Sequence, residues 1–243
     1  MASKDPDIAR PRALVIGSSG GIGAALARGL QARGFAVEGL SRASGTDLEG
    51  ARPSIDLADE NSIAAAAASL RDKAPFSQIL IATGLLHSAD LAPEKALRDL
   101  DPASLARLFA VNATGPMLVA KHFIPLLPRR GRGIFAALSA RVGSIGDNRL
   151  GGWYGYRASK AALNMLIKTL AIELARTRPD AICVGLHPGT VDTGLSQPFQ
   201  RAVAPGQIFS PDQSAAHLLD VLDGLTAVQS GGCFAWDGQE IIP

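Results

Sequence analysis

Apolar runs of strand length alternate along the chain with stretches of helix length. The strand-like runs are nearly continuous, as in "ILIA" at 79–82, and predict strands at 12–17, 35–41, 53–56, 77–84, 133–139, 181–188 and 232–236. The intervening stretches predict helices at 21–34, 58–73, from 101 onward, around 156 and at 211–225. Asp101 and Pro102 fit the N-cap and the first position of the third helix.

This alternation predicts the fold class. Parallel strands need helical crossovers, and right-handed crossovers place helices on both faces of a sheet. We therefore expect an α/β protein with a single Rossmann-type, doubly wound parallel sheet of about seven strands. The sequence contains no repeat, linker or change of composition, so residues 12–243 are expected to form one domain after a flexible segment at 1–11.

Composition and charge exclude several classes of function. Of 243 residues, 47% are hydrophobic and 19% charged, with a net charge of +2. Because acidic and basic residues are interleaved, we expect neither nucleic acid nor a membrane surface as a partner. The N-terminus does not resemble a secretory signal, and no continuous run of about 20 apolar residues occurs, so a cytoplasmic location without a membrane span is expected. Cys183 and Cys233 stand in apolar runs and are expected to be buried thiols, with no metal site.

A glycine-rich turn, "GSSGGIG", occupies Gly17–Gly23, where the first predicted strand meets the first helix. Glycines there permit a tight turn and a close approach to a pyrophosphate, whose charge is favoured by the N–H groups and dipole of the helix N-terminus. The spacing is G-x3-G-x-G rather than the commoner G-x-G-x-x-G. A purely structural turn is the alternative, but its place at the first strand–helix junction favours a dinucleotide.

The residues that close the second predicted strand bear on the choice of dinucleotide. An acidic residue there binds the ribose 2′-hydroxyl of NAD, whereas a basic one accommodates the 2′-phosphate of NADP. Here the strand ends in Ser41 and Arg42, and Glu38 lies three residues too early. The alternative is that Arg42 is merely a solvated surface residue. We predict NADP(H).

The stretch "YRASK" places Tyr156 and Lys160 at positions i and i+4 of a predicted helix, and therefore on one face. An ammonium group there favours the phenolate and lowers the tyrosine pKa, so that the phenol can act as an acid or base near neutral pH. Alone, the pair is weak evidence, because a half-buried tyrosine beside a solvated lysine gives the same spacing.

Together, the glycine turn and this pair resemble the short-chain dehydrogenase/reductase family. Further stretches match in the expected order: "SIDLAD" with Asp56, "IATG" at Ile81–Gly84, "VNATGP" with Asn112, and "HPGTVDT" at His187–Thr193. Within the family, "ATGLLH", "PEK" and "FAWDG" are similar to the branch that contains sniffer-type carbonyl reductases and bacterial C-factor (C-signal precursor) proteins.

The resemblance implies hydride transfer between NADP(H) and a small carbonyl or alcohol substrate, such as an aldehyde, ketone or quinone. Tyr156 would be the acid or base, Lys160 would lower its pKa and hold the ribose, and Asn112 would kink its helix and hold a water. It also implies a homodimer or homotetramer through helices at 101–127 and 154–176. A C-factor-like signalling protein and a nucleotide-binding scaffold remain alternatives. The implied cofactor-binding residues are Gly17, Ser19, Gly21, Ile22, Gly23, Ser41, Arg42, Asp56, Leu57, Ala82, Thr83, Gly84, Tyr156, Lys160, Pro188, Gly189, Val191 and Thr193.

One departure from the family pattern concerns the catalytic serine. The family has two serines after the fifth strand, and the second is catalytic, but here the stretch reads "LSARVGS", with Ala140 at the second position. Three alternatives follow: Ser139 is shifted into the site, Ser144 reaches it from the loop, or serine assistance is missing. We take Ser139 as the candidate.

Overall fold

The computed structural model describes residues 10–42, 46–47, 50–51, 54–202 and 206–242. Residues 1–9 of the predicted N-terminal segment lie outside these ranges. The helices are α1 (Gly21–Ala32), α2 (Glu60–Ser69), α3 (Pro102–Phe109), α4 (Gly115–Phe123), α5 (Tyr154–Thr177) and α6 (Pro211–Gly224). Short helical turns are η1 (Arg71–Lys73), η2 (Leu97–Asp99), η4 (Ile124–Leu126), η5 (Arg141–Gly143), η6 (Gln197–Ala202) and η7 (Ala227–Gln229).

The central sheet is parallel, as predicted, and its strand order is β10-β7-β6-β5-β1-β2. Its strands are β1 (Arg12–Ile16), β2 (Ala36–Leu40), β5 (Gln78–Ile81), β6 (Gly133–Leu138), β7 (Ala181–His187) and β10 (Cys233–Ala235). Two small sheets pair β3 (Thr46–Asp47) with β4 (Gly50–Ala51), and β8 (Thr190–Val191) with β9 (Ile208–Phe209).

The prediction of about seven strands needs one correction. Within the described ranges the central sheet has 6 strands, and the segment predicted as a strand at 53–56 forms only an isolated parallel bridge between Ser41 and Ser54. Part of that segment lies outside the described residues.

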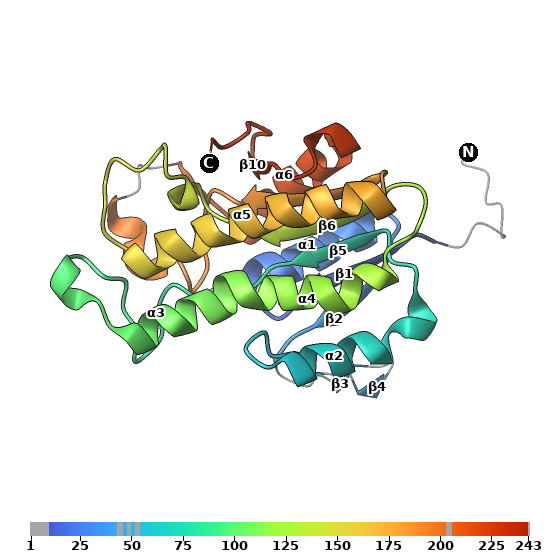
Figure 1. Ribbon diagram of the computed structural model, residues 1–243, viewed down its shortest axis with the longest axis horizontal. Helices are drawn as coiled ribbons and strands as arrows, with labels where there is room; N and C mark the ends of the chain where they lie inside the picture. Colours follow the sequence, from blue (N-terminus) through green and yellow to red (C-terminus); the bar gives the residue numbers. More distant parts are fainter. Residues whose placement is uncertain (1–9, 43–45, 48–49, 52–53, 203–205, 243) are drawn as a thin grey trace.

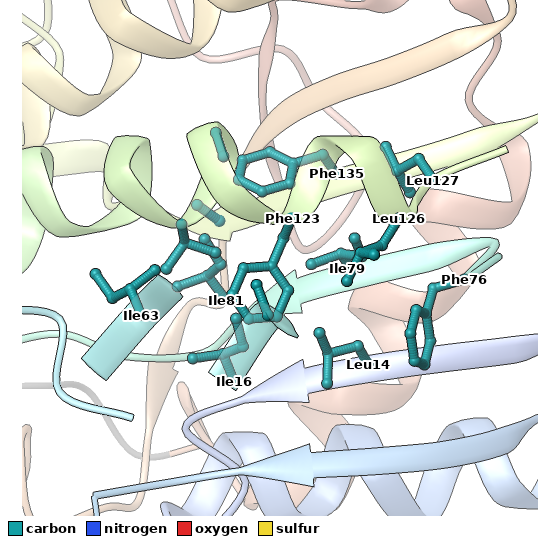
Figure 2. Close-up of a cluster of buried hydrophobic side chains, with 14 of the residues drawn as sticks. Leu14, Ile16, Ile63, Phe76, Ile79, Ile81, Phe123, Leu126, Leu127 and Phe135 are labelled. Atoms are coloured by element: carbon teal, nitrogen blue, oxygen red, sulfur yellow. The ribbon is translucent and has the colours of Figure 1, made fainter. Parts of the chain in front are cut away.

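Helices cover both faces of the sheet (Figure 1). Alternate strand residues face opposite sides, so one core packs between the sheet and α2, α4 and α5, and a second packs between the sheet and α1 and α6. Figure 2 shows the first core, in which Phe76, Phe123 and Phe135 are fully buried among aliphatic side chains of β1 and β5. This two-sided burial explains why the strands are apolar throughout.

A π-helical segment, η3 (Ala110–Thr114), joins α3 to α4. The three form one helical run that lies beside α5 (Figure 1). As predicted, the Asp101 carboxylate caps α3 by accepting a hydrogen bond from Ser104 N at 2.7 Å, with Pro102 in the first turn. By length and composition alone, Pro102–Leu126 could cross a membrane. Polar residues interrupt its apolar runs, so it has no continuous apolar stretch of about 20 residues. In this fold Val119, Ala120 and Phe123 of this run pack against the sheet, and 39% of its apolar window is buried.

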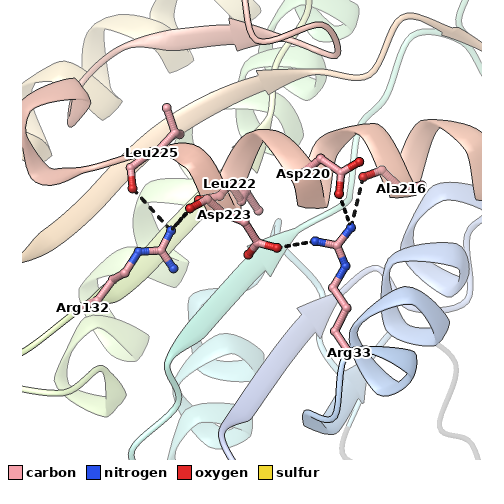
Figure 3. Close-up of polar contacts among 7 residues, drawn as sticks. All are labelled: Arg33, Arg132, Ala216, Asp220, Leu222, Asp223 and Leu225. Carbon is pink, nitrogen blue, oxygen red and sulfur yellow. Dashed lines mark hydrogen bonds and ion pairs between the residues drawn. The ribbon is translucent and has the colours of Figure 1, made fainter.

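Two arginines fix α6 against its neighbours (Figure 3). Arg33, at the end of α1, pairs with Asp220 and Asp223 and also donates to the carbonyl of Ala216. Arg132, just before β6, donates to the carbonyls of Leu222, Asp223 and Leu225 at the end of α6. The last carbonyls of a helix carry its partial negative charge, so a cation at this end stabilises it.

Replacing Phe123 tests the core that packs between the sheet and α4. Its side chain is 0% exposed, so Phe123→Ala should lower the free energy of unfolding by about 3–5 kcal/mol through lost burial and a cavity. Val228→Ala is the control, because Val228 is 94% exposed and its truncation should change stability by less than about 0.5 kcal/mol. Urea unfolding measures both. Equal effects of the two variants would contradict this packing.

Candidate active site

The turn after β1 leaves the N-terminus of α1 open. Gly17 has φ +90°, and a Cβ there would lie 3.0 Å from the carbonyl of Ala82. Gly17 N and Ser18 N donate to Leu40 O, which ties the turn to the end of β2. Gly20 is the N-cap of α1 and has no side chain that could occupy the first N–H groups of the helix. These groups are therefore available to an anion.

A cavity of about 400 Å³ lies at this turn and extends across the carboxyl ends of the parallel strands. Most of the predicted cofactor-binding residues line it: Gly17, Ser19, Gly21, Ile22, Ser41, Arg42, Asp56, Leu57, Ala82, Thr83, Gly84, Tyr156, Lys160, Pro188 and Thr193. Lining residues that the sequence prediction missed are Gly20, Ile55, Leu85, Arg107, Val111, Leu138, Gly194 and Leu195. Most of these are apolar, and an apolar side chain carries no sequence signal of its role.

Three predicted cofactor residues do not line the cavity but shape its wall. A Cβ on Gly23, inside α1, would lie 2.1 Å from Gly17 O, so this glycine allows the helix to pack under the turn. Gly189 has φ +77° and its Cβ would lie 2.7 Å from the Phe209 ring. Val191 is 3% exposed and pairs with Phe209 between β8 and β9. Each of the three packs against protein, and their contact with a cofactor stays a prediction.

Arg42 and Asp56 both line the cavity near the end of β2. Arg42 is exposed and lines the cavity. Glu38 does not line the cavity, and its carboxylate accepts a hydrogen bond from Lys73 Nζ at 2.8 Å. Asp56 accepts from Ala58 N at 3.0 Å, and its own N–H is bonded to the Ser62 hydroxyl. The end of β2 thus presents a cation, as the sequence predicted.

Tyr156 and Lys160 lie in the first two turns of α5 and are 8% and 2% exposed. Lys160 Nζ donates to Leu138 O at 2.8 Å and lies 5.8 Å from the centroid of the Tyr156 ring. Burial raises the pKa of Tyr156 to about 12 and lowers the pKa of Lys160 to about 8. Desolvation is the cause of the raised pKa of Tyr156, and the predicted lowering of that pKa by Lys160 stays a prediction.

Asn112 is 1% exposed and does not line the cavity. It lies in η3, where its Oδ1 accepts from Leu85 N and its Nδ2 donates to Leu85 O, both at 2.8 Å. A third bond joins its Nδ2 to the hydroxyl of Ser159 at 3.1 Å. The expected irregularity of the helix at Asn112 is thus present as a π segment, and the side chain joins the loop after β5 to α5.

The serines near the end of β6 have partners other than Tyr156. Ser139 lines the cavity, but its hydroxyl donates to Asn164 Oδ1 at 2.6 Å. The Ser144 hydroxyl accepts from Asp147 N at 3.0 Å. Ala140 packs in an apolar cluster with Tyr156. A methyl group therefore stands beside the tyrosine where the family pattern has a catalytic hydroxyl.

This apolar cluster forms the surroundings of the Tyr156 ring. Trp153 and Phe199 pack against it, with ring centroids 6.2 Å from Trp153 to Tyr156 and 5.0 Å from Trp153 to Phe199. His87 lies edge-on to Phe199 at 5.7 Å and its Nε2 is 3.0 Å from Gly194 O. The remaining members are Leu86, Val142 and Leu195. The tyrosine is thus enclosed by aromatic and aliphatic groups, which is why it is desolvated.

Cys183 and Cys233 are free and buried, as predicted, and burial raises the pKa of both thiols. In the described part of the chain, no group of three His, Cys, Asp or Glu side chains is arranged to hold a metal ion.

Comparisons with known proteins agree with this geometry. C-signal of Myxococcus xanthus is 38% identical over 147 residues, which are 60% of this chain and 82% of that protein. The 1-hydroxy-2-glutathionyl-2-methyl-3-butene dehydrogenase of Rhodococcus sp. (strain AD45) is 32% identical over 224 residues, covering 90% and 93%. A short-chain dehydrogenase/reductase of Burkholderia multivorans, solved with bound NADP, has a TM-score of 0.78 at 27% identity, covering 97% of this chain and 100% of that one.

The similarity to C-signal confirms the predicted likeness to C-factor proteins. The family model described as short chain dehydrogenase matches residues 11–204, most of the chain. Because this match covers most of the chain, and the Rhodococcus dehydrogenase is similar to 90% of it, the chain belongs to the short-chain dehydrogenase family of oxidoreductases.

Proposed function

We propose that the protein reduces a small apolar carbonyl compound with NADPH, using Tyr156 as the proton donor. The observation that carries the proposal is that Tyr156 and Lys160 line the same cavity as the glycine turn. A dinucleotide on that turn and a reacting group beside the phenol would therefore share one continuous space. When bound, the reduced nicotinamide supplies the hydride.

The glycine turn fits the pyrophosphate of such a cofactor. The open N-terminus of α1 offers backbone N–H groups and the positive end of the helix dipole. Any side chain at Gly17 or Gly23 would collide with backbone atoms, so the close approach of the turn to α1 depends on these two glycines. Arg42, exposed at the end of β2, would pair with a 2′-phosphate.

The pKa of Tyr156 suits the direction of reduction. With a pKa of about 12, the phenol keeps its proton at neutral pH and can pass it to the oxygen that becomes an alkoxide when hydride arrives. Lys160, with a pKa of about 8, is still largely charged at neutral pH, and Leu138 O engages one of its N–H groups. The ammonium can therefore hold ribose hydroxyls and favour the phenolate that forms.

The walls around Tyr156 indicate the substrate. Ala140 and Phe199 offer neither a charge nor a hydrogen-bond donor beside Tyr156, and Trp153 adds a largely apolar ring with a single indole N–H. The substrate is therefore an apolar aldehyde, ketone or quinone whose carbonyl accepts one hydrogen bond from Tyr156. Of the three alternatives for the serine, its absence from catalysis fits best, because Ser139 and Ser144 bond to other partners.

Substitution of the tyrosine and lysine tests the proposal. Tyr156→Phe should lower kcat for carbonyl reduction by about 10²–10⁴-fold while NADPH affinity stays within about twofold, because the hydroxyl serves the substrate. Lys160→Ala should weaken both. Tyr154→Phe is the control, since Tyr154 is 41% exposed and lies outside the cavity. NADPH oxidation against a panel of carbonyls is the assay. No turnover by the unaltered protein would favour the signalling or scaffold alternative.

Replacing Arg42 tests the cofactor. Loss of a charged bond to the 2′-phosphate should remove about 1.5–3 kcal/mol, or about ten- to a hundredfold in affinity. Arg42→Ala should therefore weaken NADPH binding and leave NADH binding unchanged, as measured by fluorescence titration. Arg149→Ala is a control, because Arg149 is exposed and outside the cavity. Equal titration curves for NADPH and NADH in the unaltered protein would overturn the assignment.

Restoring the missing hydroxyl tests the role of Ala140. Ala140→Ser places a second donor beside Tyr156, and kcat should rise up to about tenfold, because a donor that faces developing negative charge lowers the barrier. Ser144→Ala, which loses only a loop hydrogen bond, should leave kcat within about twofold. Single-turnover kinetics measure the chemical step directly. If Ser139→Ala lowered that step by about 10²-fold or more, a serine would assist after all.

A further inference from the structure

The start of α5 is held by a residue that comes from a distant loop. Glu94 is 3% exposed, and its carboxylate accepts hydrogen bonds from Gly155 N at 3.2 and 3.3 Å. Its own backbone carbonyl accepts from Trp153 N at 2.6 Å. One residue thus caps the first turn of α5 twice, through its side chain and its main chain. Tyr156 follows directly after Gly155.

Two features show that this contact is specific. A Cβ on Gly155 would lie 2.8 Å from Glu94 Oε1 and 2.6 Å from Leu108 Cδ1, so the carboxylate fills the space that any side chain at 155 would need. Trp153 has φ 50° and ψ 44°, and it is the one described residue other than glycine with positive φ. A bulky residue adopts this conformation only where its surroundings hold it.

The N-terminus of α5 explains why the Glu94 carboxylate can be buried there. No side chain of α5's own N-cap satisfies the first N–H groups, because the N-cap is Trp153. A carboxylate is favoured at the positive end of a helix dipole, and the backbone N–H group compensates part of the loss of water. Glu94 therefore replaces a local cap, and it fixes where the first turn of α5 lies relative to the rest of the site.

We propose that Glu94 is the positioning residue for Tyr156: it sets the first turn of α5, and with it the position of the phenol, through Gly155 and Trp153. The inference rests on the proposed role of Tyr156 in catalysis. Glu94 does not line the cavity and acts only through α5. Lys160 lies one turn further along and is held independently by Leu138 O, so cofactor binding should depend on Glu94 much less than the reaction does.

The test compares three variants of Glu94. Glu94→Ala should lower kcat by about 10- to 100-fold, because a small displacement of the phenol disrupts proton transfer, with NADPH affinity within about threefold. Glu94→Gln keeps an acceptor oxygen and should restore kcat to within about threefold of the unaltered protein. Glu94→Asp is one methylene too short to reach Gly155 N and should resemble Glu94→Ala; it also serves if the alanine variant does not fold. Asp101→Ala, which removes the exposed cap of α3, is the control and should leave kcat within about twofold.

Hydrogen exchange separates this inference from the proposed function. In Glu94→Ala, the amides of 153–157 should exchange at least about tenfold faster, while those of the middle of α5 stay unchanged. That result would stand even if Tyr156→Phe proved fully active and the catalytic proposal failed. Unchanged exchange at 153–157, or equal losses of kcat and NADPH affinity in Glu94→Ala, would overturn the positioning role.

Discussion

All pairings of the central sheet are parallel, and this constraint brings the site together. Because every strand runs the same way, β1, β2, β5 and β6 all end at one edge, and the segments that follow them face one cavity. The glycine turn, Arg42, the "ATG" stretch and Ser139 are distant in sequence but meet there. Helix α5 completes the cavity because Lys160 Nζ bonds to the carbonyl of Leu138, the last residue of β6.

Burial at that edge shifts the pKa values of Tyr156 and Lys160 in opposite directions. It raises the pKa of Tyr156 and lowers that of Lys160, so both neutral forms are favoured. A neutral phenol is the form that gives a proton to a carbonyl oxygen, and a lysine with a pKa of about 8 still carries charge at neutral pH. In the proposed reduction, the apolar walls formed by Ala140, Trp153 and Phe199 would exclude water from the site as well as receive the substrate.

The site also depends on hydrogen bonds that tie α5 to other segments of the chain. Asn112 ties the loop after β5 to α5 through Leu85 and Ser159, and Ser139 ties β6 to α5 through Asn164. Glu94 holds the start of the same helix. Each of these bonds joins α5 to a different segment, so the orientation of Tyr156 is determined by several contacts at once. Such redundancy suits a group whose hydroxyl must be placed to a fraction of an ångström.

The sequence by itself determined the alternation of strands and helices, the parallel sheet, the glycine turn and the pairing of Tyr156 with Lys160, because each follows from local periodicity or fixed spacing. It also located Ala140 where a serine was expected. Tertiary structure decided the rest. The pKa values reflect desolvation, which depends on packing from all sides, and Gly23, Gly189 and Val191 face protein because of what lies opposite them. Glu94 meets Gly155 across 61 residues, and no local pattern encodes a contact made by chain folding.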